Sequence, residues 1–281
     1  NLMHRNVEFC ERSSKMKIAK NALSIVLSFV LVFTALIPAF ATAVPSDEET
    51  TATAAENVEN SEDEKTQDEG TSYDKELEEQ WDNTEEAKRG IVINPGKDET
   101  ERNFRWYMAK DVIKARVEIS ENEDMSEKKS FDAEIITTYQ GDKAAKATVT
   151  GLTAGKTYYY TCVSGDKASE IYSFTTDDSE FSALYMSDIH VYDDPKDSES
   201  LKRTSFDFVK LIEKAKKNSE FNFMLSGGDM ATEGQRVEYE GLSFSEASRS
   251  LTIANVMGNH DRNSFDFKYY SNFPNEDFGP M

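Results

Sequence analysis

The stretch Ser226-Gly-Gly-Asp-Met230 decides the fold, together with Ser187-Asp-Ile-His190 before it and Gly258-Asn-His-Asp261 after it. Each of the three motifs follows a short apolar run that is typical of a buried strand in an α/β sheet. These runs span residues 181–186, 221–225 and 251–257. Open α/β sheets place their ligand crevice at the carboxyl ends of successive strands. The pattern therefore predicts that the polar side chains of the three motifs meet at one edge of a parallel sheet.

The segments between these runs indicate helices. Residues 204–217 carry apolar side chains at a spacing of three to four residues, which is typical of an amphipathic helix. Residues 232–250 are less regular, and we expect a second helix there. Alternation of strands and helices implies parallel pairing with right-handed crossovers. We therefore expect residues 177–281 to form the first part of an α/β domain.

The side chains of the three motifs are metal ligands by chemical type. Divalent transition metals accept carboxylate, amide oxygen and imidazole ligands together. Asp188 and His190 are two residues apart and can chelate one ion, while Asp229 has two carboxylate oxygens that can bridge two ions. Asn259 offers a neutral amide oxygen to the second ion. Two metal ions about 3.5–4 Å apart can supply a hydroxide and offset the charge of a phosphoryl group.

His260 and Asp261 are the catalytic candidates beside these ligands. His260 is left free to face a substrate, where it can protonate a leaving group or hold a phosphoryl oxygen. Asp261 can orient that imidazole through its carboxylate. Gly-Asn-His-Asp alone is also compatible with a capping turn that carries a surface histidine. The order of the three motifs, each after a strand pattern, favours the metal site.

Residues 90–176 alternate in hydrophobicity between turn residues, and about seven short strands at this spacing predict an antiparallel β-sandwich. Gly151-Leu-Thr-Ala-Gly-Lys-Thr-Tyr158 predicts a tyrosine corner, in which a tyrosine hydroxyl bonds to the backbone just upstream. We expect Trp106 to pack in the core rather than bind a ligand. We expect Cys162, which lies in a tyrosine-rich strand pattern, to be a buried structural thiol.

The amino terminus, residues 1–43, has the pattern of a secretory signal peptide. Met16-Lys-Ile-Ala-Lys20 is positively charged, residues 22–39 are nearly all apolar and carry no charge, and small residues place the cleavage near Ala41 or Ala43. An uncleaved membrane anchor is the alternative, because the apolar run approaches spanning length. The small residues, followed at once by acidic residues, favour cleavage. We place the start at Met16 and expect a secreted or cell-surface protein that meets the membrane only through this peptide.

Residues 44–89 are rich in acidic and small polar residues and carry few large apolar ones. Such a segment buries too little apolar surface to offset its conformational entropy, so we predict a disordered acidic spacer. A helix over residues 73–88 is the alternative. The whole chain has a formal net charge of −21, which excludes the basic surface that a nucleic-acid partner requires.

Two sets of residues resemble known families. Arg105-Trp106, Ala115-Arg-Val-Glu118, Ala147-Thr-Val-Thr-Gly-Leu152 and Tyr158-Tyr-Tyr160 resemble the amino-terminal sandwich domain of purple acid phosphatases. The three motifs resemble the calcineurin-like metallophosphoesterase signature Asp-x-His, Gly-Asp, Gly-Asn-His-Asp/Glu. The resemblance implies an α+β multi-domain protein, with an antiparallel β-sandwich followed by part of an α/β metallophosphoesterase sandwich. It also implies hydrolysis of phosphate esters, as in acid phosphatases, by two ions of iron, manganese or zinc.

The chain departs from these families in two ways. Thr232 stands where purple acid phosphatases carry an iron-binding tyrosine, and His190 stands where their first motif usually has glycine. A general metallophosphoesterase site is therefore expected rather than an iron–tyrosinate centre. The family completes its site with later histidines, whereas this chain has only His4, His190 and His260. We therefore expect a fragment whose remaining ligands lie beyond Met281 and which hydrolyses little by itself.

Two other functions fit the same residues. A surface adhesion or spacer protein with a non-catalytic phosphoesterase-like domain would explain the sandwich, the acidic spacer and the absence of later ligands. A nuclease or nucleotide phosphodiesterase of the same superfamily would use Arg262, beside the histidine motif, to contact a phosphate. The sequence predicts no particular oligomeric state.

Overall fold

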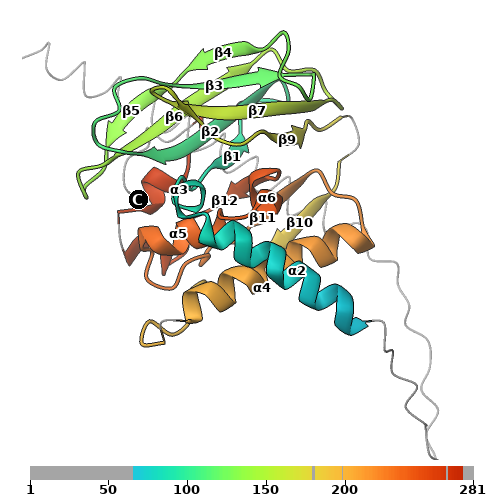
Figure 1. Ribbon diagram of the computed structural model, residues 1–281, viewed down its shortest axis with the longest axis vertical. Coiled ribbons are helices and arrows are strands. Elements are labelled where there is room, and N and C mark those ends of the chain that lie inside the picture. The colour runs from blue at the N-terminus through green and yellow to red at the C-terminus, as the bar shows by residue number, and fades with distance from the viewer. Residues whose placement is uncertain (1–65, 179–180, 198, 264, 275–281) are drawn as a thin grey trace, which may run out of the picture. The chain divides into compact units, whose positions relative to one another are not determined.

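The computed structural model describes residues 66–178, 181–197, 199–263 and 265–274, with side chains from Asp74 onward. The predicted signal peptide and residues 44–65 of the predicted spacer lie outside the described residues. The described residues belong to one compact unit of mixed helices and strands, which confirms the predicted α+β class (Figure 1). In these ranges no helix has both the length and the apolar character that a membrane crossing requires.

Two antiparallel layers form the predicted β-sandwich. One layer holds β2 (Glu101–Met108), β6 (Lys143–Thr150) and β5 (Glu134–Thr137). The other holds β4 (Lys129–Asp132), β3 (Ala115–Ser120), β7 (Thr157–Ser164) and β8 (Lys167–Ala168), with β9 (Tyr172–Thr175) paired to β7. All residues of β2 are buried, because one face of the strand lies in the sandwich core and the other faces the carboxyl-terminal half.

Three residues of the sandwich have the structural roles expected of them. The hydroxyl of Tyr158 accepts the backbone N–H of Thr153 at 2.9 Å, which forms the predicted tyrosine corner. Trp106 is fully buried and donates its indole N–H to Ser164 at 2.9 Å. Cys162 is buried, and burial raises the pKa of its thiol, so the reactive thiolate is disfavoured. The sandwich therefore has an ordinary packed core.

The carboxyl-terminal half contains the predicted parallel sheet. The strands are β10 (Ala183–Met186), β11 (Phe223–Ser226) and β12 (Thr252–Asn255), which pair in parallel. Helix α4 (Ser200–Asn218) connects the first two, and α5 (Arg236–Leu242) and α6 (Glu246–Arg249) connect the second pair. The helices pack on one face of this sheet, through residues such as Val209, Ile212 and Met224. On the opposite face, the register neighbours Tyr185 and Leu225 are 65% and 41% exposed.

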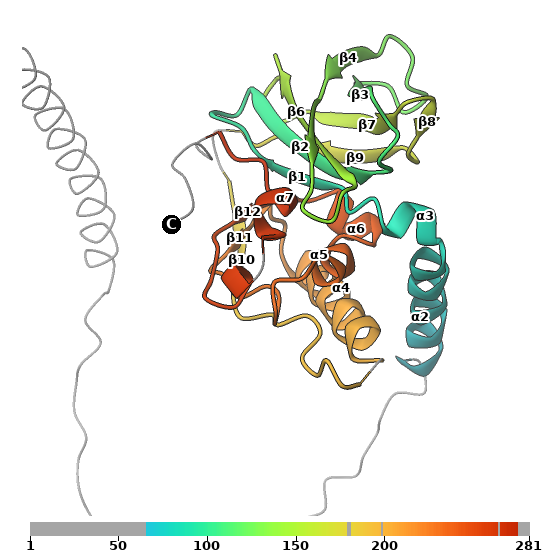
Figure 2. The same cartoon turned by 90° about the vertical axis from the view of Figure 1, so that its left-hand side faces the viewer.

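Strand β1 (Val92–Pro95) joins the two halves into one sheet (Figure 2). It pairs antiparallel with β2 and parallel with β12, where Ile93 is the register partner of Thr252. The side-chain amide of Asn94 adds a hydrogen bond of 2.8 Å to the carbonyl of Ile253. The result is a seven-stranded sheet with the order β10-β11-β12-β1-β2-β6-β5. The sequence predicted short strands within residues 90–176, but not the place of this one between the two halves.

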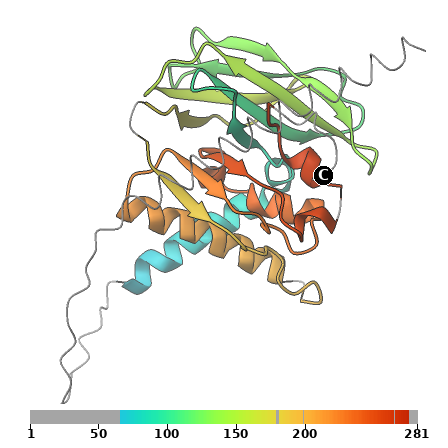
Figure 3. The same ribbon diagram turned by 180° about the vertical axis from the view of Figure 1, so that it is seen from behind.

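The predicted disordered spacer is wrong for its carboxyl-terminal part, where the alternative of a helix over residues 73–88 holds in outline: this part forms α2 (Thr66–Asp82) and α3 (Thr84–Ala87). Figures 1 and 3 show α2 crossing α4. Leu77 is 1% exposed, and the ring of Trp81 lies edge-on to Phe206 and Phe244 at centroid distances of 5.9 and 5.1 Å. Helices are stabilised mainly by tertiary packing of one face. A few well-placed apolar residues therefore suffice, although the composition is acidic.

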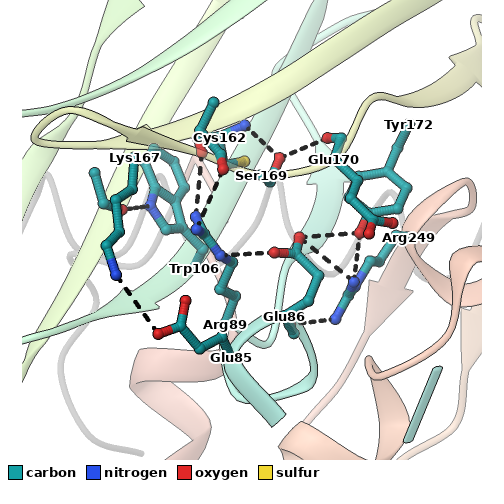
Figure 4. A network of polar contacts seen from close by, with 12 residues as sticks. Glu85, Glu86, Arg89, Trp106, Cys162, Lys167, Ser169, Glu170, Tyr172 and Arg249 are labelled. Carbon is teal, nitrogen blue, oxygen red and sulfur yellow. Dashed lines mark hydrogen bonds and ion pairs between the residues drawn. The ribbon is translucent and has the colours of Figure 1, made fainter. Parts of the chain in front are cut away.

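A buried polar network around Arg249 of α6 connects α3, β9 and the helical layer (Figure 4). Its guanidinium donates to the hydroxyl of Tyr172 at 2.6 Å and to the carbonyl of Glu86 at 2.5 Å. A third donor reaches the carbonyl of Ser243 at 3.0 Å. Tyr160 in turn donates to the carbonyl of Arg249 at 2.8 Å. The network therefore fixes the sandwich to the segment that leads into β12.

We expect Arg249→Met to lower the free energy of unfolding by about 3–5 kcal/mol, because it leaves several buried acceptors without their charged donor. Urea unfolding followed by circular dichroism measures this change. Arg203→Met is the control, since it removes an arginine from exposed pairs with Asp193 and Asp197. We expect the control to change stability much less. Equal losses in the two variants would contradict a structural role for the network.

We expect Leu77→Ala to lower the free energy of unfolding by about 2–5 kcal/mol, the usual range for truncation of a buried leucine. Leu211→Ala on α4 is the matched control, because Leu211 is 50% exposed and loses little packing. The same unfolding experiment compares the two. If Leu77→Ala were as mild as Leu211→Ala, α2 would not be packed, and the spacer prediction would hold for this segment.

Candidate metal site

The structure places the three motifs at the carboxyl ends of the parallel strands. The predicted site residues that follow β10, β11 and β12 are, in order, Asp188 and His190, then Asp229, then Asn259, His260 and Asp261. The first two loops are held together along their backbones. The N–H of Asp188 donates to the carbonyl of Gly228, and the N–H of His190 to that of Asp229, both at 3.1 Å. The strand ends therefore bring the motifs to one edge of the sheet.

His190, Asp229 and His260 form a three-residue cluster. One donor atom from each lies within 4.8 Å of the other two. The two imidazole rings meet edge to face, with centroids 4.5 Å apart. Two imidazole nitrogens and a carboxylate oxygen at this spacing fit zinc or a similar transition metal. His260, expected to face the substrate, thus has a ring nitrogen beside the donor atoms of the expected ligands His190 and Asp229.

The predicted ligand Asp188 lies outside this cluster of three. The carboxylate of Asp188 is exposed and accepts the hydroxyl hydrogen of Ser187. It does not share the 4.8 Å group. Asn259 directly precedes His260 in the loop after β12. The ligand roles of Asp188 and Asn259 therefore stay predictions.

The backbone of the first two loops is strained. Asp188, His190 and Asp229 have φ angles of 55°, 49° and 50°, in the left-handed region that non-glycine residues avoid. Such conformations cost about 1–3 kcal/mol each and persist only where the surrounding structure enforces them. They cluster at functional sites. The strained backbone therefore supports the interpretation that these loops form the functional site at this edge of the sheet.

Two glycines allow the loops after β11 and β12 to approach each other. A Cβ on Gly228, whose φ is 104°, would lie 2.9 Å from the Cα of Gly258. A Cβ on Gly258 would lie 2.1 Å from a carboxylate oxygen of Asp229. Any larger residue at either position would push the loops apart. The glycines of the second and third motifs therefore allow the loops to come close enough for His190, Asp229 and His260 to cluster.

Asp261 holds the same two loops together through a fully buried carboxylate. One oxygen accepts the N–H of Ala231 at 3.2 Å and the hydroxyl of Tyr239 at 3.0 Å. The other accepts the N–H of Gly258 at 2.9 Å. Burial, followed by the charge of Asp261 and the hydrogen bond to it, raises the pKa of Tyr239 far above its ordinary value. The phenol therefore stays protonated and remains a donor.

The His260 imidazole, which Asp261 was expected to orient, is oriented by a backbone carbonyl group. The Nδ1 atom of His260 lies 2.7 Å from the carbonyl oxygen of Thr232. A carbonyl oxygen only accepts hydrogen bonds, so Nδ1 carries the hydrogen and Nε2 is the free nitrogen. The backbone N–H of His260 also donates to a carboxylate oxygen of Asp229 at 2.7 Å. Thr232, noted in the sequence only because it replaces a tyrosine, therefore fixes the imidazole through its backbone.

Sequence reasoning passed over Glu238, which supports that backbone. Its buried carboxylate accepts the N–H groups of Thr232, Glu233 and Gln235 at 2.5 to 3.0 Å. Burial raises the pKa of Glu238, although these hydrogen bonds oppose the shift. The local signal was the capping-box spacing of Gln235 and Glu238 at the start of α5. Tyr239 had no such signal, because its partner Asp261 is distant in the sequence.

Two family models match the chain. Residues 89–176 match the family described as purple acid phosphatase, N-terminal domain. Residues 181–280 match the family described as calcineurin-like phosphoesterase. A comparison with curated proteins finds no match.

Solved structures give low similarities. Purple acid phosphatase PPD1 from yellow lupin (Lupinus luteus) seeds is 13% identical with a TM-score of 0.49, covering 61% of this chain and 35% of that protein. PhoD is 12% identical with a TM-score of 0.42, covering 62% and 39%. The sensor domain of the anti-sigma factor RsgI4 in Pseudobacteroides cellulosolvens is 20% identical with a TM-score of 0.25, covering 32% and 90%. The chain thus spans little more than a third of the length of the first two proteins.

The matched segments coincide with the two parts of the described structure. The first contains the sandwich, and the second contains the parallel sheet and the metal cluster. The resemblance stated from the motifs is therefore confirmed: residues 89–176 match the purple acid phosphatase N-terminal domain, and residues 181–280 match the calcineurin-like phosphoesterases.

Proposed function

We propose that this protein hydrolyses phosphate esters at a centre of two metal ions, in the manner of an acid phosphatase. One observation carries the proposal: donor atoms of His190, Asp229 and His260 converge within 4.8 Å at the ends of parallel strands. The match of residues 181–280, which include these three, to calcineurin-like phosphoesterases supports it. Iron, manganese and zinc all suit nitrogen and oxygen donors of this kind.

Four of the motif residues would be the metal ligands. His190 and Asp188 would hold one ion, Asn259 the other, and Asp229 would bridge both. Bound ions of this kind supply a hydroxide nucleophile and offset negative charge on the phosphoryl group. The chain itself provides loops whose strained backbone and paired glycines keep these donors close before an ion arrives. Preorganised donors of this kind pay little reorganisation cost when the charge develops.

His260 would serve the leaving group rather than hold an ion, so that its Nε2 stays free to carry a proton. Its Nδ1 hydrogen bond to the carbonyl of Thr232 is possible in both protonation states of the ring, so the ring keeps its orientation while Nε2 gains or loses a proton. A general acid needs this constancy, because it must face the leaving oxygen before and after proton transfer. Within the proposal, Asp261 acts on the loops rather than on the imidazole.

We further propose export, on the basis of the signal-peptide pattern in residues 16–43, and a phosphate ester as the binding partner. The net charge of −21 argues against the nuclease alternative. The packed helix α2 weakens the adhesion alternative, since part of the acidic spacer is built into the fold.

Calorimetric titration with Mn²⁺ or Zn²⁺ tests the site. We expect the wild-type chain to bind metal and Asp229→Ala to weaken binding by more than the roughly 10- to 100-fold typical of outer-shell changes. Asp132→Ala, which alters an exposed aspartate on β4, is the control and should bind as the wild type does. Inorganic phosphate should bind only when metal is present. Release of p-nitrophenol from its phosphate ester, dependent on metal and on Asp229, would establish hydrolysis.

Metal binding that Asp229→Ala leaves unchanged would contradict the proposed site. Phosphate binding that needs no metal would contradict the proposed chemistry, even if the metal itself bound at Asp229.

A further inference from the structure

One hydroxyl group connects the candidate metal site to the helical layer. Tyr239 of α5 and Asp261 are both fully buried, and the phenol donates to the carboxylate at 3.0 Å. The same carboxylate accepts the N–H of Ala231, after β11, and that of Gly258, after β12. Rotation of this carboxylate would release both loops at once. The direction of the carboxylate is therefore a constraint on the site.

Tyr239 is itself held in place by a stack of rings. It stacks on Tyr270 of α7 (Phe267–Tyr270), with centroids 4.6 Å apart and planes at 23°. The guanidinium carbon of Arg105 lies 5.3 Å from the centroid of Tyr270 and 3.7 Å from that of Tyr107. Arg105 is fully buried in β2 and donates to the carbonyl of Gly90 at 2.7 Å. Cation–π contacts of this kind strengthen when water is excluded.

We propose that Tyr239 is a positioning residue for the metal site, and that the sandwich supports it through Arg105 and Tyr270. The Tyr239 hydroxyl sets the orientation in which Asp261 clasps both loops. Through these loops it keeps the metal ligand Asp229 and the general acid His260 in place beside each other. The effect on metal affinity rests on the proposed function, whereas the positioning of the loops does not. The sandwich thereby gains a role in the geometry of the site.

The two stacked tyrosines differ in one respect. Both are fully buried, but the hydroxyl of Tyr270 has no hydrogen-bond partner among the described residues, whereas that of Tyr239 has Asp261. Tyr239→Phe and Tyr270→Phe therefore remove the same atom from adjacent rings of the same stack. Only the first change removes a donor from the carboxylate. Comparison of the two variants therefore distinguishes loss of the Asp261 hydrogen bond from a change in packing of the ring stack.

Amide hydrogen exchange tests the inference without requiring metal. We expect Tyr239→Phe to speed exchange at residues 229–232 and 258–261 by about tenfold, the effect of losing one buried hydrogen bond. Exchange in β3 and β7 of the sandwich should stay as in the wild type. Tyr270→Phe should leave all of these segments unchanged. Mn²⁺ affinity should fall by roughly 10- to 100-fold in Tyr239→Phe, as for other outer-shell changes, and stay constant in Tyr270→Phe.

Wild-type exchange in both site loops of Tyr239→Phe would overturn the inference, as would equal loosening in the two tyrosine variants. Asp261→Asn provides a second variant if Tyr239→Phe does not fold, because it keeps the side-chain size but replaces one acceptor with a donor. It should loosen the same loops, and wild-type exchange there would also overturn the inference. Loosened loops in Tyr239→Phe with no metal binding by the wild type would support the positioning role and reject the proposed function.

Discussion

The buried carboxylate of Asp261 is the interaction on which the candidate site depends. Its oxygens accept two backbone N–H groups and one phenol hydroxyl, so a charge that is costly to bury is satisfied by three donors. These bonds join the loop after β12 to the loop after β11, in which Asp229 adopts a left-handed backbone conformation. Strained loops of this kind relax unless neighbouring groups enforce them. The carboxylate provides that enforcement where the loops after β11 and β12 meet.

The sandwich is part of the same construction rather than an attached module. Strand β1 pairs with strands of both halves, so one sheet runs from β10 to β5. Arg249 adds a buried polar connection between α3, β9 and α6. Arg105 of β2 lies against the aromatic stack that ends at Tyr239. Three independent contacts thus make the sandwich a rigid support for the edge of the sheet where the metal donors converge.

Sequence patterns predicted the features that are local in the chain. Apolar runs followed by Asp229 or His260 identified strand ends, and the spacing of Leu152 and Tyr158 identified a turn whose hydrogen bond the structure confirms. Features that depend on distant contacts were missed. A strand such as β1 has the same pattern wherever it pairs, and the acidic composition of α2 conceals the few side chains, Leu77 among them, that dock it.

The same limit applies within the site. The residue types of the metal cluster were evident from the motifs, but the partner that orients His260 is a backbone carbonyl, and every residue has one. The bond between Tyr239 and Asp261 joins two segments whose proximity follows only from the folded sheet and its helices. Ligand chemistry could therefore be predicted from side chains, whereas the groups that position the ligands required the fold.

The most direct measurement of the central claim is anomalous X-ray scattering from crystals of the protein grown with Mn²⁺. Convergence of the motif side chains on metal predicts an anomalous peak in coordination contact with His190 and Asp229, at the ends of β10 and β11. Crystals saturated with Mn²⁺ that show no peak there, or show metal only at other residues, would contradict it.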